Sequence, residues 1–134
     1  MAQISPVLMP ICELCDRLTI ARLKLERLPE QEIDKTGLQK QLDYYQAGVD
    51  PALSRLSCLI EDLYLINGQI WDTEAAIRQG CDGSLGLEEI GRRALKIRNL
   101  NRIRVAIKNS IADLTAQPEF RDCKMNHVSE VADS

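Results

Sequence analysis

The sequence has almost no histidine and lacks the motifs of several common enzyme classes. Its one histidine, His127, lies near the C-terminal end, so a histidine base and a histidine-ligated metal have little support. It has no glycine-rich phosphate loop, no G-x-S-x-G nucleophile motif and no pair of C-x-x-C motifs. These absences argue against the common nucleotide-binding, serine-hydrolase and zinc-ribbon classes.

Long apolar runs are also absent, and none reaches the length of a membrane span. The N-terminal MAQISPVLMPICELC lacks the basic start and apolar core of a signal peptide. We therefore predict a cytoplasmic protein without a membrane span. The net charge of -3 provides no global attraction to nucleic acid or anionic lipid, so we predict no nucleic-acid partner.

Five cysteines, an odd number, do not form a disulfide framework in a chain without an export signal. Cys12 and Cys15 form a C-x-x-C, but neither a preceding strand nor a second ligand pair accompanies them. Both fit the apolar side of a helix. We expect reduced thiols that pack as small hydrophobic side chains.

Apolar residues recur at helical spacing almost throughout, and strand-like alternation is absent, which predicts an all-α fold. The chain of 134 residues has the size of a single domain, with an N-terminal arm over 1–8 and a polar tail over 115–134. Helices are expected over 9–28, 29–47, 50–79 and 87–114. Asp50 and Pro51 are expected to start the third helix, and Gly37 weakens the second. The glycine-containing segment 79–86 is expected to form a loop.

The third and fourth helices are long enough to form the antiparallel hairpin on which we expect the helical bundle to be built. Apolar surface left on so elongated a hairpin would favour a homodimer. Both helices carry polar residues on their apolar stripes. Asn67 and Glu74 interrupt the third, while Asn101, Arg104 and Lys108 interrupt the fourth.

Two interpretations of these polar residues stay open. In the first, a carboxylate such as Glu74 pairs with Arg104 in a network that fixes the register of the two helices. In the second, the polar residues line a ligand pocket in the bundle, with Trp71 as a stacking platform. The candidate ligand-binding residues are Asn67, Trp71, Glu74, Arg78, Asn101, Arg104 and Lys108.

From residue 90 to 112 the chain has no acidic residue, so the fourth helix is locally cationic. One interpretation is that this charge is balanced by acidic neighbours, namely Asp16, Glu26, Glu61, Asp62, Asp72 and Glu74. The other is that the helix binds an anion such as a phosphate or a nucleotide sugar. Glu13 and Asp16 lie one turn apart and could share a divalent metal with Glu61, Asp62 or Glu74. The candidate metal ligands are Glu13, Asp16 and Glu74.

Three segments carry a resemblance to a family: ICELCDRLTIARLKLERL, INGQIWDTEAAIR and RRALKIRNLNRIRVAIKNSIADL. They resemble uncharacterised bacterial helical proteins that tend to be encoded beside lipopolysaccharide glycosyltransferases, except for Cys12 in place of glycine and a different tail. The match covers most of the chain outside 29–57. The matching positions are Glu13, Leu14, Asp16, Lys24, Glu26, Asn67, Trp71, Glu74, Arg78, Asn101 and Arg104.

The resemblance implies a cell-envelope setting but no activity. The leading hypothesis is a non-enzymatic binding or assembly module linked to envelope polysaccharide synthesis, without a cofactor, whose partner is a phosphate-containing small ligand or another protein. The alternative is an enzyme, a magnesium-dependent all-α nucleotide pyrophosphohydrolase. It requires the carboxylates of the first and third helices to converge on one metal.

Overall fold

The computed structural model describes residues 9–32, 34–80, 83 and 85–121. All regular secondary structure in these residues is helical, so the predicted all-α bundle is confirmed. The elements in chain order are α1 (Ile11–Arg27), α2 (Lys35–Val49), the 3-10 turn η1 (Asp50–Ala52), α3 (Leu53–Gly80), α4 (Leu87–Leu114) and the 3-10 turn η2 (Pro118–Phe120).

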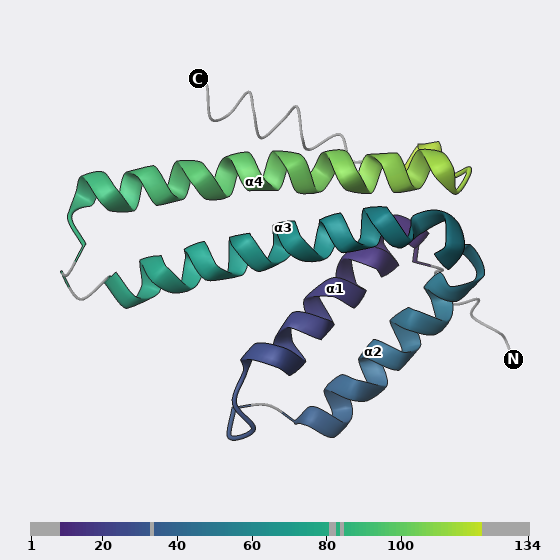
Figure 1. The fold of residues 1–134 in the computed structure, drawn as a ribbon, viewed down its shortest axis with the longest axis horizontal. Helices are drawn as coiled ribbons and strands as arrows, with labels where there is room; N and C mark the ends of the chain where they lie inside the picture. The colour runs from purple at the N-terminus through teal and green to yellow at the C-terminus, as the bar shows by residue number, and fades with distance from the viewer. Residues whose placement is uncertain (1–8, 33, 81–82, 84, 122–134) are drawn as a thin grey trace, which may run out of the picture.

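The fold consists of two helical hairpins. Helices α3 and α4, of 28 residues each, run antiparallel side by side over their whole length (Figure 1). Helices α1 and α2 form the shorter hairpin, which packs against the N-terminal half of α3 (Figure 1). The rest of the long hairpin extends beyond α1 and α2.

Helix α2 begins six residues later than the sequence predicts. The chain turns after Pro29, where the Glu32 amide donates to the Pro29 carbonyl. The helix starts instead after Asp34, whose carboxylate accepts a hydrogen bond from the Gly37 amide at 3.1 Å. Gly37 therefore lies in the capped first turn, where an Asp cap stabilises a helix by about 1 kcal/mol.

The predicted break between the second and third helices is a bend. Asp50 has right-handed helical backbone angles, and its carboxylate accepts from the Gln46 side chain at 2.8 Å instead of capping free amides. Pro51 lies in the first turn of the 3-10 segment, where its missing amide hydrogen is not needed for a helical hydrogen bond. Val49 and Ala52 are buried on the inside of the bend, so the chain changes direction around the core.

The apolar core lies where the two hairpins cross. It combines α1 and the α2–α3 bend with the N-terminal half of α3 and the C-terminal end of α4, and its members are Cys12, Leu14, Cys15, Leu18, Val49, Ala52, Leu56, Ile60, Leu63, Ile111 and Ala112. Gln117, just after α4, accepts a hydrogen bond from the Ile11 amide at 3.0 Å. This bond ties the start of α1 to the end of α4.

Several predicted features fall outside the described residues. They include the N-terminal arm over 1–8 and the part of the predicted tail over 122–134, which contains His127. Two of the five cysteines, Cys81 and Cys123, also lie outside the described residues. The predicted loop over 79–86 is described only in part. Gly80 belongs to α3, and a side chain there would collide with Leu85, because an added Cβ would lie 2.3 Å from its Cδ1 atom.

Candidate functional site

Asn67, the first polar interruption of α3, is buried and hydrogen-bonded. Its side-chain amide donates to Asp16 Oδ1 at 3.0 Å and to Thr19 Oγ1 at 2.8 Å. The Thr19 hydroxyl in turn donates to the Asp16 carbonyl at 2.8 Å. A buried amide without partners would cost free energy, and these bonds remove that cost. Asn67 therefore links α3 to α1 through two side-chain hydrogen bonds.

Asp16 connects three helices. Its side chain is almost completely buried, and it accepts from Arg104 Nε at 3.0 Å and Arg104 Nη2 at 2.5 Å. Two parallel hydrogen bonds between a guanidinium and a carboxylate combine charge with fixed geometry. We call Asp16, Thr19, Asn67 and Arg104 the polar junction, because they join α1, α3 and α4.

A second ion pair lies one turn away on the same two helices. Lys108 Nζ is 2.5 Å from Glu13 Oε1, and the lysine is buried. Glu13 and Asp16 are three residues apart on α1, and their partners are four residues apart on α4. The two pairs hold α1 against α4 in one register.

The ionisation of Asp16 depends on this arrangement. Burial, the largest single influence, would raise its pKa. The hydrogen bonds and charge of Arg104, the hydrogen bond from Asn67 and the charge of Lys108 together outweigh burial. The pKa of Asp16 therefore lies below its ordinary value of 3.8. The carboxylate is charged in the folded protein at neutral pH.

This lowered pKa predicts a loss of stability in acid. The folded state binds fewer protons than the unfolded state, in which aspartate titrates at about pH 3.9. The contribution of Asp16 is complete above that pH and is lost as the pH falls through the folded pKa. Between about pH 5 and pH 3, the melting temperature of the native protein should fall more steeply than that of an Asp16→Asn variant. Calorimetry at matched ionic strength measures both slopes, and equal slopes would contradict this role.

The pairing expected between Glu74 and Arg104 is wrong. Since α3 ends at Gly80 and α4 begins at Leu87, residues at equal distances from these ends lie opposite each other, which places Glu74 beside residue 93. Arg104 is eleven residues farther along α4, roughly 16 Å away. Glu74 is exposed and forms no ion pair within the described residues.

The other candidate ligand residues are distributed along the hairpin. Asn101 accepts from Arg104 Nη1 at 3.4 Å and so adjoins the polar junction. Trp71 is half-buried, and Arg78 is exposed near the end of α3. The predicted seven-residue site is therefore not one pocket. Four of the seven lie at or beside the Asp16–Arg104 and Glu13–Lys108 ion pairs. They are Asn67, Asn101, Arg104 and Lys108.

The three candidate metal ligands do not converge. Asp16 is bound by Arg104, Glu13 by Lys108, and Glu74 lies on the exposed side of α3. Among the described residues, no three histidine, cysteine or acidic side chains form a group that could hold a metal. The geometry required by the pyrophosphohydrolase alternative is not present in this part of the chain.

The prediction that Cys12 and Cys15 pack in the core is confirmed. Both are buried free thiols. Burial raises the pKa of Cys15 to about 12. Burial and the neighbouring Glu13 raise the pKa of Cys12. Because the thiolate is the nucleophile and the metal ligand, burial and the raised pKa values both disfavour reaction of these cysteines at neutral pH.

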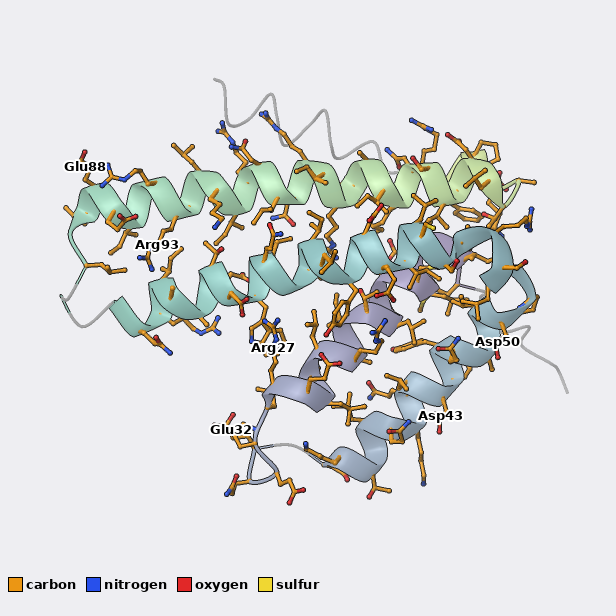
Figure 2. All side chains as sticks on the ribbon, viewed as in Figure 1. Arg27, Glu32, Asp43, Asp50, Glu88 and Arg93 are labelled. Atoms are coloured by element: carbon orange, nitrogen blue, oxygen red, sulfur yellow. The ribbon has the colours of Figure 1, made fainter. Side chains whose placement is uncertain are left out.

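The cationic α4 is balanced only in part by the acidic residues expected to face it. Asp16 pairs with Arg104, but Glu61 pairs with Arg22 on α1. Asp72 pairs with Arg27, which lies at the end of α1 next to α3 (Figure 2). At its N-terminal end, α4 balances itself, because Glu88 and Glu89 pair with arginines one turn later, Arg92 and Arg93.

A cavity of about 470 Å³ lies between α1 and α2 and reaches α4 at Arg104. Arg17 and Lys24 of α1 and Gln41 and Tyr45 of α2 line it. No sequence pattern indicated this cavity, because its wall combines residues of α1 with residues of α2, the least regular of the predicted helices. A lysine or arginine on a helix usually indicates only a solvated surface.

Comparison with protein-family models, with curated proteins and with solved structures finds no match. The envelope-associated family stays a prediction from the sequence pattern. None of the described helices is long and apolar enough to cross a membrane.

Proposed function

We propose that this chain is a non-enzymatic assembly module that pairs with a second copy through the outer end of its long hairpin. The cell-envelope setting implied by the family resemblance belongs to the same proposal. We define the distal hairpin as residues 73–80 of α3 and 87–95 of α4. The observation that carries the proposal is an exposed stripe on this element, formed by Leu87, Gly91 and Leu95.

The distal hairpin has little core of its own. Over residues 87–95 of α4 no side chain is buried, and on the α3 side only Thr73 and Gly80 are buried. Helices α1 and α2 pack farther along the hairpin and leave this end uncovered (Figure 1). Helical segments in proteins draw most of their stability from packing of an apolar face. A partner that covers the distal hairpin supplies such packing.

The stripe has the form of a helix contact. Leu87, Gly91 and Leu95 are spaced by four residues and share one face of α4, and the two leucines are 88% and 52% exposed. Glycine inside a helix costs about 1 kcal/mol relative to alanine. Nothing lies within 4 Å of a Cβ added at Gly91, so contacts within the chain do not explain this glycine.

A second copy explains all three residues. In a twofold antiparallel pair centred on Gly91, Leu87 of one copy lies beside Leu95 of the other, and the glycines allow the backbones to approach closely. The two distal hairpins then form a four-helix bundle. The polar junction lies in the other half of the molecule, where it keeps α1 and the hairpin in register.

Light scattering during size-exclusion chromatography tests the proposal. The native protein should elute with about twice its chain mass of 15.1 kDa. A Leu95→Glu variant should elute as a monomer, because the interface would bury an unpaired charge. Gly91→Leu should also weaken pairing, although the monomer has room for the new side chain.

Leu114→Glu is the matched control. Leu114 is 51% exposed, almost the same as Leu95, but it lies at the opposite end of α4. This variant should keep the native mass. A native protein that is monomeric at all accessible concentrations would overturn the proposal. So would a Leu95→Glu variant that keeps the dimer mass.

A further inference from the structure

We propose that the cavity between α1 and α2 binds a small organic phosphate through Arg17 and Lys24. This site lies away from the distal hairpin and adds a ligand to the proposed assembly role. The cavity volume of about 470 Å³ falls in the range of about 300–1,000 Å³ that is typical of small-molecule pockets. A ligand the size of a phosphorylated sugar fits this space.

The charge of the lining comes from the ion pairs around it. Two carboxylates, Glu13 and Asp16, line the cavity, which at first suggests a cation site. Both are neutralised from α4, Glu13 by Lys108 and Asp16 by Arg104. Arg104 also lines the cavity, but its charge is already matched by Asp16. The acidic side chains therefore do not repel an anion.

Arg17 and Lys24 give the cavity its remaining charge. Both are exposed, and within the described residues neither forms an ion pair. They lie seven residues apart on the same face of α1, with about 10 Å between their positions along the helix axis. Their long side chains can close on one anion from two sides. An arginine fork and a lysine point charge are both common ligands of phosphate.

The rest of the cavity lining suits the body of an organic ligand. Ala21 and Leu38 are buried in the cavity wall and provide an apolar surface. Gln41 and Tyr45, from successive turns of α2, provide an amide and a phenol that can bind hydroxyl groups. Polar and charged side chains outnumber these apolar ones in the lining, so the cavity suits an organic ligand rich in hydroxyl groups better than an apolar one. The combination favours a phosphate ester over a bare inorganic ion.

Isothermal titration calorimetry with glucose 1-phosphate, inorganic phosphate and glucose tests the site. Glucose 1-phosphate should bind best, inorganic phosphate at least tenfold more weakly, and glucose not measurably. An Arg17→Gln/Lys24→Gln double variant should lose at least tenfold in affinity for glucose 1-phosphate. Its melting temperature should be unchanged, because both side chains are exposed. The titration is done at low salt, since screening weakens such contacts.

The matched control is Lys40→Gln/Arg55→Gln, which removes two exposed cations that do not line the cavity. It should bind like the native protein. The monomeric Leu95→Glu variant should also bind normally, so this test does not depend on assembly. No binding of glucose 1-phosphate to the native protein, or equal binding to the Arg17/Lys24 variant, would overturn the proposal. Equal affinities for glucose 1-phosphate and inorganic phosphate would show that the rest of the cavity lining does not bind the organic part of the ligand.

Discussion

Replacement of Asp16 by alanine should lower the free energy of unfolding by about 3 kcal/mol or more. The substitution removes the carboxylate that binds Arg104 and Asn67, and it leaves a half-buried guanidinium and a buried amide without that partner. For a chain of this size, the loss corresponds to a decrease in melting temperature of about 10 °C. Denaturant unfolding followed by circular dichroism measures the change directly.

The matched control is Glu61→Ala. Glu61 also pairs with an arginine across two helices, at 3.2 Å from Arg22, but 62% of its side chain is exposed. Exposed ion pairs contribute at most about 1 kcal/mol. The Asp16 variant should therefore be several times more destabilised than the Glu61 variant. Similar small losses in both would show that the polar junction does not hold the helices together.

Replacement of Leu63 by alanine should cost about 3 kcal/mol, with a range of about 2–5 kcal/mol for such substitutions. Leu63 is completely buried in the core where the two hairpins cross, four residues before Asn67 on α3. Truncation removes apolar contacts and leaves a cavity in a closely packed region. The same unfolding measurement gives the loss.

Leu65→Ala provides the comparison for this site. Leu65 lies two residues farther along α3 on its outer side and is 58% exposed. Its truncation should change the free energy of unfolding by about 0.5 kcal/mol or less. If both substitutions lowered the free energy of unfolding equally, the assignment of the face of α3 that packs against α1 and α4 would be wrong.

Local sequence patterns were sufficient for most of the fold. The limits of α4 agree with the prediction, because a glycine-containing loop precedes the helix and Pro118 follows it. The predicted start of α2 is wrong because Pro29, a residue that can begin a helix, opens a turn here. The bend at Asp50 was missed because a proline after an aspartate fits both a new helix and a 3-10 turn.

The candidate site was predicted less completely. Asn67 and Arg104 were singled out because polar residues on an apolar stripe are unusual, and both are in the polar junction. Asp16 was predicted as an acidic neighbour of the fourth helix, but its specific pairing with Arg104 was not, since the two residues lie 88 positions apart and no local pattern encodes that contact. The pairing of Glu74 with Arg104 is wrong because an apolar stripe indicates which face of a helix packs. It does not indicate which residues of two packed helices lie opposite each other along the helix axis.

Hydrogen exchange at two protein concentrations shows whether a second copy covers the distal hairpin, as we propose. Backbone amides of residues 73–80 and 87–95 should exchange slowly at high concentration and faster after dilution below the dissociation constant of the dimer. Amides of α1 and of the core half of α3 should exchange equally at both concentrations. Exchange in the distal hairpin that does not depend on concentration would contradict the account.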